Sequence, residues 1–466
     1  MITSNKLSLF EDNIAVITPD NSKYSYAQII EYRKIFSDKV EPRSLVFCLS
    51  ENTIGSLVGY ISFITSDIVP LIIDGELDKE LLNNFIDTYQ PNYIWAPEDS
   101  FINKHGDVVL NILGYSLIKF SKSMIHEIHD DLCLLLPTSG STGSPKLVRL
   151  SYNNIYSNAH SISEYLSIDE NEKPIMLLPM YYSFGLSIIN SHLIKGATIL
   201  LTKNSLMEKK FWLFLKENEA TSLSGVPYTF EMLKKIRFFN MELPTLKTIT
   251  QAGGKLDDAL NRDISEYCNK SGKFFFIMYG QTEASPRMGY LPHNQSINKI
   301  GSMGIAIPGG KFSLIDDSGD LINEDNKDGE LVYEGKNVSM GYATSVNDLS
   351  AGDLNNGVLL TGDIARRDSE GYYFIIGRKK RFIKLFGLRV SLDMTEILLK
   401  NILSECACTG GDDKMIIYIT EKEKIGEVKS FISKKIGINL KAFDVNYIAE
   451  IPKNSSGKII YSKLIK

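Results

Sequence analysis

A segment rich in Ser, Thr and Gly, ending in a lysine, is the strongest chemical signal in the sequence. Pro137-Thr-Ser-Gly-Ser-Thr-Gly-Ser-Pro-Lys146 follows the apolar run Leu132–Leu136. Glycines permit tight turns, and successive backbone N–H groups and hydroxyls can surround phosphate oxygens. The spacing differs from that of the Walker loop. Composition alone leaves two interpretations open, a phosphate-binding loop and a flexible surface loop.

A second cluster places an aromatic ring, a hydroxyl and a carboxylate close together. Tyr279-Gly-Gln-Thr-Glu283 ends the strand-like run Phe274–Met278. A tyrosine ring can stack on adenine, a threonine hydroxyl can contact a phosphate, and a carboxylate can hold magnesium. A core tyrosine beside a surface glutamate is the alternative. Upstream, Ala252-Gly253-Gly254 follows another strand-like run, Leu246–Thr250.

Two further motifs lie toward the C-terminus. Thr361-Gly-Asp363 is followed by Gly377-Arg378, and Pro452-Lys-Asn-Ser-Ser-Gly-Lys458 lies near the end of the sequence. A buried aspartate is costly unless it is hydrogen-bonded, and a pair of sugar hydroxyls would satisfy it. In isolation, the first motif could be a turn and the second a polar tail.

Taken in order, these motifs resemble those of the adenylate-forming enzymes, which include acyl- and aryl-CoA synthetases, firefly luciferase and the adenylation domains of peptide synthetases. The resemblance covers the sequence from about Pro137 to Lys458, with Leu147 standing where the family usually has Gly. It implies ATP- and Mg²⁺-dependent activation of a small carboxylic acid as its acyl-AMP, with release of pyrophosphate. The acyl group would then pass to a thiol, either of coenzyme A or of a carrier protein's phosphopantetheine arm.

The resemblance also implies roles for individual residues. Thr282 contacts phosphate, Glu283 ligates magnesium, and Lys458 is the catalytic lysine, a mobile cation that stabilises charge developing in the transition state. Asp363 holds the ribose with Arg378 beside it, and Lys380 is the hinge about which a small domain rotates. The other predicted nucleotide-binding residues are Thr138, Ser139, Gly140, Ser141, Thr142, Gly143, Lys146, Gly253, Gly254, Tyr279 and Gly280.

The predicted acyl pocket contains Tyr182 and Gly185, within Pro179-Met-Tyr-Tyr-Ser-Phe-Gly-Leu186. Acyl-CoA synthetases usually have His at the position of Tyr182, and amino-acid-activating domains have Asp. A tyrosine cannot supply the negative charge that pairs with an ammonium group, so α-amino acids are disfavoured. A packed core tyrosine is the alternative for Tyr182.

Several alternatives stay open at the level of function. They are an amino-acid-activating enzyme, a luciferase-like oxidoreductase and a non-catalytic AMP-binding module, the last disfavoured by retention of Glu283 and Lys458. The short region after Lys380 slightly favours a carrier protein over coenzyme A as acceptor.

The elements that must position these residues follow an α/β pattern, with short apolar runs alternating with helical periodicity. Ligand sites in such folds form beyond the carboxyl ends of strands, where the first motifs lie. We predict a large AMP-binding domain at residues 1–379, with mixed sheets and a β-rich part. A small mobile α+β domain at 380–466 is predicted to contain helices at Leu392–Ile402 and Ile425–Ile436 and a strand at Met415–Ile419.

Composition excludes several other classes of protein. The net charge of −5 over 466 residues disfavours a nucleic-acid partner. The apolar stretch Leu57–Ile73 is interrupted by polar residues and a proline, which predicts a buried helix running into a strand and no stable membrane insertion. The N-terminus lacks a secretory pattern, and five scattered cysteines suit a reducing cytoplasm. Cys406 and Cys408 are predicted core thiols, and His126–His129 a connector and not a zinc site.

Overall fold

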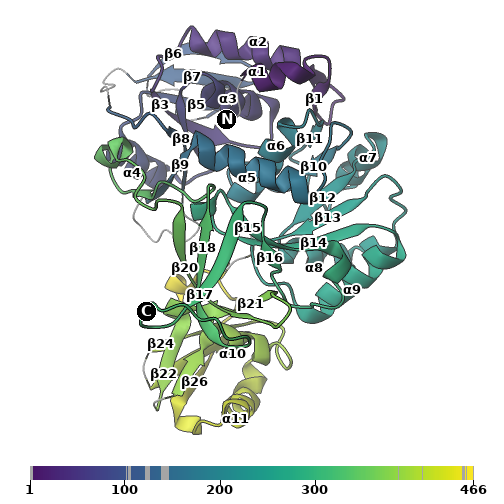
Figure 1. Cartoon of the computed structure of the whole chain (residues 1–466), viewed down its shortest axis with the longest axis vertical. Helices are drawn as coiled ribbons and strands as arrows, with labels where there is room; N and C mark the ends of the chain where they lie inside the picture. Colours follow the sequence, from purple (N-terminus) through teal and green to yellow (C-terminus); the bar gives the residue numbers. More distant parts are fainter. Residues whose placement is uncertain are drawn as a thin grey trace. The chain divides into compact units, whose positions relative to one another are not determined.

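The computed structural model describes residues 4–100, 102, 106–120, 126–137, 146–386, 388–411, 413–453, 457 and 459–464. The chain divides into two compact units (Figure 1). Unit 1 comprises Met1–Lys311 and Tyr333–Leu359, and unit 2 comprises Phe312–Val332 and Leu360–Lys466. The predicted boundary between residues 379 and 380 stays a prediction.

Unit 1 contains a nine-stranded mixed sheet in the order β16-β15-β14-β13-β12-β10-β11-β1-β2. Its strands from β14 to β1 are parallel, and β2, β15 and β16 are antiparallel to their neighbours. The strands are β1 (Ile14–Ile17), β2 (Lys23–Ser25), β10 (Pro174–Met176), β11 (Ile199–Leu201), β12 (Ser222–Gly225), β13 (Thr248–Gln251), β14 (Phe274–Gly280), β15 (Arg287–Leu291) and β16 (Ile305–Ala306).

A second mixed sheet in unit 1 has eight strands in the order β19-β9-β8-β4-β3-β5-β7-β6. The strands β8, β4, β3 and β5 are parallel, and antiparallel strands flank them on both sides. The strands are β3 (Leu45–Ser50), β4 (Val69–Asp74), β5 (Tyr93–Pro97), β6 (Asp107–Ile112), β7 (Tyr115–Lys119), β8 (Leu132–Pro137), β9 (Leu147–Ser151) and β19 (Tyr342–Ala343).

Helices of unit 1 pack on both sheets, and α5 and α6 lie between them (Figure 1). The α-helices are α1 (Ser4–Leu7), α2 (Tyr26–Ser37), α3 (Ile54–Thr65), α4 (Lys79–Tyr89), α5 (Tyr152–Tyr165), α6 (Ser183–Leu193), α7 (Lys209–Glu217), α8 (Pro227–Lys235) and α9 (Asp258–Lys270). The 3₁₀ helices are η1 (Ser8–Phe10), η3 (Phe238–Asn240), η4 (Thr282–Ala284), η5 (His293–Gln295) and η6 (Val346–Ser350).

Local sequence explains where the central helices begin. Ser151 caps α5 by accepting a hydrogen bond from the backbone N–H of Asn154, whose side chain reciprocates at the backbone of Ser151. The helix α3 is buried along almost its whole length and is followed by β4, which confirms the prediction made for Leu57–Ile73. Among the described residues, no helix is both long enough and apolar enough to cross a bilayer.

Unit 2 contains three smaller sheets, in the orders β17-β18-β20-β21, β22-β23 and β24-β25-β26. Their strands, wholly or mostly in unit 2, are β17 (Gly310–Ile315), β18 (Asp328–Gly335), β20 (Val358–Arg367), β21 (Tyr373–Arg378), β22 (Phe382–Leu385), β23 (Leu388–Ser391), β24 (Cys406–Gly411), β25 (Lys414–Ile419) and β26 (Phe443–Tyr447). The helices are α10 (Leu392–Leu399), α11 (Ile425–Ile436), η7 (Lys379–Arg381), η8 (Lys422–Lys424), η9 (Leu440–Ala442) and η10 (Tyr461–Lys463).

The core of unit 2 agrees with most of its predicted elements. The helix α11 has the predicted bounds, whereas α10 ends at Leu399 and not at Ile402. Cys406 and Cys408 lie on β24, buried and without a disulfide, as predicted for core thiols. The mixed sheets of unit 1 and the α+β character of unit 2 confirm the predicted fold class.

Candidate active site

The turn after β14 presents the predicted phosphate and magnesium residues. The strand pairing shifts register between Tyr279 and Gly280, and the backbone N–H of Gln281 then donates to the carbonyl of Pro286 at 2.9 Å. A Cβ atom at Gly280 would lie 1.8 Å from that carbonyl oxygen. The close approach therefore requires glycine, and it places Thr282 and Glu283 on η4 directly beyond the strand.

The predicted acyl-pocket motif meets this turn. The hydroxyl oxygens of Ser183, the first residue of α6, and Thr282 lie 3.1 Å apart, in hydrogen-bond contact. A Cβ atom at Gly185 would lie 2.2 Å from the carbonyl oxygen of Pro179, so glycine lets the start of α6 lie against the preceding loop. Tyr182 immediately precedes α6 and is partly exposed, with its ring centroid 4.9 Å from that of Tyr181.

Glu283 and Lys146 are both in contact with Tyr342, a residue that the sequence analysis did not select. The Tyr342 hydroxyl donates to Oε1 of Glu283 at 2.9 Å, and Nζ of Lys146 lies 3.3 Å from the centroid of the Tyr342 ring. Desolvation and the neighbouring Glu283 raise the pKa of Tyr342, so its hydroxyl stays protonated and can donate. Tyr342 lies on β19 and pairs with Val148 on β9, close to Lys146 in sequence.

The donor set at Glu283 fits magnesium. Glu283 is partly exposed and offers one carboxylate. Mg²⁺ is commonly held by one or two carboxylates together with substrate phosphates and water, so a nucleotide would supply the remaining ligands.

The predicted adenine-binding residues lie on neighbouring strand ends. Gly253 and Gly254 follow β13, which runs parallel to β14 with Gln251 opposite Ile277. The buried Gln251 side chain donates to the carbonyl of Gly254 at 2.8 Å and fixes this turn beside the end of β14, where Tyr279 lies. Parallel strands bring their carboxyl ends to one edge of a sheet, which explains the proximity.

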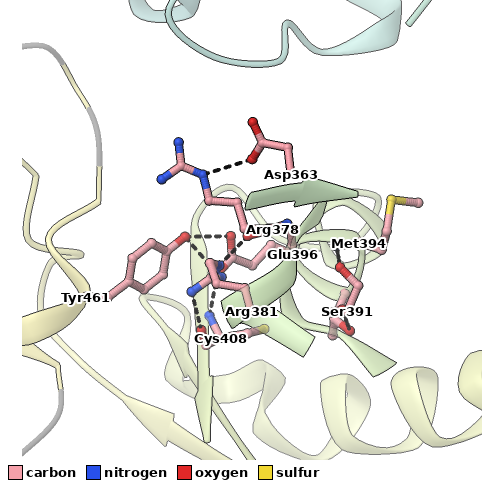
Figure 2. A network of polar contacts seen from close by, with 10 residues as sticks. Asp363, Arg378, Arg381, Ser391, Met394, Glu396, Cys408 and Tyr461 are labelled. Atoms are coloured by element: carbon pink, nitrogen blue, oxygen red, sulfur yellow. Dashed lines mark hydrogen bonds and ion pairs between the residues drawn. The ribbon is translucent and has the colours of Figure 1, made fainter. Parts of the chain in front are cut away.

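In unit 2, the predicted ribose residue is buried beside its predicted neighbour. Asp363 on β20 is opposite Arg378 on β21, and Oδ1 of Asp363 lies 3.4 Å from Nε of Arg378 (Figure 2). Asp363 is buried, whereas 67% of the Arg378 side chain is exposed. An ion pair with one exposed partner contributes little to stability.

A network of polar contacts extends from the hinge region of unit 2 to its C-terminal segment (Figure 2). Arg381 forms an ion pair with Asp393, and its Nη2 lies 2.7 Å from Oε1 of Glu396. Asp393 also accepts a hydrogen bond from the backbone N–H of Arg378 at 3.0 Å. Burial raises the pKa of Glu396, although Arg381 opposes this shift, and Tyr461 donates to both carboxylate oxygens at 2.9 and 3.1 Å.

The residues on either side of Lys458 are anchored in the same unit. Lys453 and Ile459 form a β-bridge, and the backbone N–H of Ile460 donates to the carbonyl of Pro452 at 2.8 Å. Tyr461 is thus held both by its position after this bridge and by its bonds to Glu396.

The comparison with known families decides the identity. The pattern of a family described as AMP-binding enzyme matches residues 39–343. This chain belongs to the AMP-binding enzyme family. The resemblance inferred from the sequence motifs is therefore confirmed.

Two characterised relatives are similar to this AMP-binding enzyme in sequence. The 2-succinylbenzoate–CoA ligase of Listeria innocua is 26% identical over 70% of this chain and 68% of the relative. The luciferin 4-monooxygenase of Photuris pensylvanica is 24% identical over 95% of this chain and 79% of the relative.

Solved structures show the same fold. The O-succinylbenzoate coenzyme A synthetase of Bacillus subtilis in complex with AMP is 20% identical and has a TM-score of 0.81, covering 99% of this chain and 98% of that one. The same synthetase in complex with ATP and magnesium has a TM-score of 0.81 and 21% identity, covering 99% of each chain.

Some predicted site residues of this AMP-binding enzyme lie outside the described part of the chain. They are Thr138, Ser139, Gly140, Ser141, Thr142, Gly143 and Lys458. The pairing of β8 with β9 extends to Pro137 and Leu147. The predicted phosphate-binding segment, which ends at Lys146, lies between these two residues in the sequence. Lys380 lies on η7 with an exposed side chain, and its hinge role stays a prediction.

Proposed function

We propose that this AMP-binding enzyme is an acid–thiol ligase. It activates a small carboxylic acid with ATP, forming acyl-AMP and pyrophosphate, and then transfers the acyl group to the thiol of coenzyme A or of a carrier protein's phosphopantetheine arm. The observation that carries the proposal is the contact between the hydroxyls of Ser183 and Thr282. It brings the predicted acyl motif next to the predicted phosphate-binding residue Thr282, which precedes Glu283 on η4.

The residues of unit 1 bind and orient the reactants. Thr282 holds the α-phosphate next to the acid, because its hydroxyl already contacts the start of the acyl motif. Glu283 ligates Mg²⁺, and Lys146 with residues 138–143 holds the other phosphates. Tyr279, Gly253 and Gly254 surround the adenine, while Tyr182 and Gly185 line the acyl pocket. When bound, Mg²⁺·ATP supplies the electrophilic α-phosphorus and the pyrophosphate leaving group.

The residues of unit 2 complete the nucleotide site and the catalysis. Asp363, a buried carboxylate with an exposed arginine as partner, accepts hydrogen bonds from the ribose hydroxyls, with Arg378 beside it. Lys458 supplies the cation that stabilises charge developing between the acid and the α-phosphate. Rotation about Lys380, between a large domain at 1–379 and a small one at 380–466, then withdraws Lys458 so that the thiol can reach the acyl carbon.

Action in the cytoplasm, and the absence of nucleic-acid partners, stay predictions from composition.

The choice between coenzyme A and a carrier protein is tested by supplying each thiol to the acyl-AMP form of the enzyme.

Exchange of labelled pyrophosphate into ATP tests the first half-reaction. We expect exchange that requires both Mg²⁺ and an acid, with AMP and not ADP as the product in the presence of a thiol. Glu283→Gln should raise the Mg²⁺ concentration needed, whereas Glu231→Gln, the same change at an exposed position on α8, should not. Release of ADP and orthophosphate would contradict adenylation.

A further inference from the structure

Arg287 is a buried cation whose hydrogen-bond contacts with the described residues are all with neutral groups. It lies on β15 and is 2% exposed. Its Nε donates to the hydroxyl of Ser187 at 3.1 Å, and its Nη1 lies 3.3 Å from the hydroxyl of Tyr165. Nη1 also lies 3.3 Å from the sulfur of Met278, and the guanidinium carbon is 5.0 Å from the ring centroid of Phe184. Within the described part of the chain, no carboxylate forms an ion pair with it.

Another buried arginine, Arg149, is held by a different kind of contact. Arg149 is 0% exposed and also lacks an acidic partner among the described residues. Its guanidinium, however, ties a loop together by donating to four backbone carbonyls, those of Met340, Tyr342, Ala351 and Gly352. Among the described residues, Arg287 makes no such backbone contact, and burying a charge without strong partners is costly.

Arg287 also lines a small cavity whose wall combines polar side chains with Leu166, Ile168 and Ile188. The cavity has a volume of about 10 Å³, the space of one water molecule. Hydroxyls from neighbouring strands line it in register, Ser222 opposite Thr248 and Ser224 opposite Thr250, because alternate residues of a strand share one face. All four are buried, and the hydroxyls of Ser224 and Thr250 are 2.7 Å apart.

His192, from α6, and Glu172 are the other polar residues that line the cavity, and Glu172 accepts a hydrogen bond from the hydroxyl of Thr221. Burial lowers its pKa to about 4, so the imidazole is uncharged at neutral pH and the positive charge belongs to Arg287. A hydrocarbon group placed beside Arg287 would give the buried guanidinium no polar partner.

Arg287 also lies close to the acyl motif. Arg287 is the strand partner of Gly280, and it contacts Ser187 and Phe184 on α6. Ser183, which contacts Thr282, lies one helical turn before Ser187, roughly 6 Å along the axis. An acid held at Thr282 and extending a few carbon atoms along α6 therefore reaches the guanidinium.

We propose that Arg287 binds a second carboxylate on the substrate, so that the enzyme activates a small dicarboxylic acid in preference to a fatty acid. The inference rests on the proposed function, because it assumes that the acyl group lies along α6. The guanidinium exchanges its contacts with the Ser187 and Tyr165 hydroxyls for the carboxylate, forming a charge-assisted pair that a hydroxyl cannot match.

The test compares acids matched in length in the pyrophosphate-exchange assay. Succinate and glutarate are compared with butyrate and pentanoate, using the full chain. We expect kcat/KM to be at least about 100-fold higher for the dicarboxylates. Arg287→Met should remove this preference without changing the KM for ATP, and Arg287→Lys should retain part of it. Arg262→Met, at an exposed position on α9, is the matched control.

Binding measured without catalysis separates this inference from the proposed function. Succinate should raise the melting temperature of the wild type and of Arg262→Met but not of Arg287→Met, and Arg287→Lys serves if the methionine variant does not fold. Exchange that prefers butyrate or pentanoate, or a dicarboxylate preference that survives in Arg287→Met, would overturn the inference and leave adenylation standing. Absence of pyrophosphate exchange with every acid would refute the proposed function. If succinate then also fails to raise the melting temperature of the wild type, the role of Arg287 is overturned as well.

Discussion

Removal of one hydroxyl, in Tyr461→Phe, is expected to weaken the anchoring of the segment next to Lys458. The Tyr461 hydroxyl lies 2.9 and 3.1 Å from the two carboxylate oxygens of Glu396, whose side chain is 12% exposed. A hydrogen bond to a charged group contributes about 1.5–3 kcal/mol. Glu396 keeps Arg381 and the backbone N–H of Cys408, each at 2.7 Å, and the phenyl ring keeps its place over Arg381. We therefore expect a loss of about 2 kcal/mol.

This loss should appear selectively in the first half-reaction. Tyr461 follows Lys458 by three residues, so weaker anchoring lowers the fraction of molecules in which Lys458 is correctly held. If the whole 2 kcal/mol is expressed in the rate, adenylation slows by about 30-fold. Thioester formation from supplied acyl-AMP should change by less than about twofold, because Lys458 takes no part in it.

Single-turnover assays of each half-reaction measure the two effects separately. Tyr447→Phe removes a hydroxyl from a half-exposed tyrosine on β26 of the same unit and should leave both rates unchanged. An unaltered adenylation rate in Tyr461→Phe, or equal losses in both half-reactions, would refute the reasoning that this network positions Lys458.

Three further predictions concern single residues of the proposed site and of the core. Tyr342→Phe removes the hydrogen bond to Glu283 but keeps the ring beneath Lys146, so a Mg²⁺ titration of pyrophosphate exchange should show a higher half-saturating concentration; an unchanged titration would mean that Tyr342 does not orient Glu283. Lys458→Ala should raise the activation barrier of adenylation by roughly 3–4 kcal/mol or more and leave thioester formation unchanged. Lys380→Pro restricts the backbone at the hinge, so it should slow thioester formation and leave adenylation unchanged; separate assays of the two half-reactions measure both effects. Burial lowers the pKa of His192 to about 4, whereas an unfolded histidine has a pKa of about 6.5. Between pH 4 and pH 6.5 or so, the histidine is therefore protonated in the unfolded chain and neutral in the folded chain. Stability should therefore rise with pH across that window by about 3 kcal/mol, and urea unfolding of His192→Gln should lack that part of the pH dependence.

The sequence alone predicts the elements that are defined locally. The predicted strand Phe274–Met278 lies within β14, because β-branched and aromatic residues favour a strand, and the observed strand continues through Tyr279 to Gly280. The helix α11 has the predicted bounds because its apolar period is unbroken, whereas the apolar pattern past Leu399 continued beyond the real end of α10.

Residues that act through distant partners could not be predicted in this way. Tyr342 is selected only when β19 pairs with β9 and brings its ring to Lys146 and its hydroxyl to Glu283. Arg287 reads as an ordinary strand arginine until the packing of β15 against α6 shows that it is buried among neutral groups. Both depend on contacts between segments far apart in the chain, which no local pattern encodes.

The central claim, that the acid is activated by attack on the α-phosphorus of ATP, is tested most directly by following oxygen atoms. An acid labelled with ¹⁸O in its carboxyl group is converted with ATP, Mg²⁺ and a thiol, and the products are weighed by mass spectrometry. Attack forms a bond between a carboxylate oxygen and the α-phosphorus and breaks the bond to the pyrophosphate, so thiol transfer must leave one ¹⁸O atom in AMP. The account predicts AMP carrying that label and unlabelled pyrophosphate. Label in orthophosphate together with formation of ADP would show activation through an acyl phosphate and would contradict it.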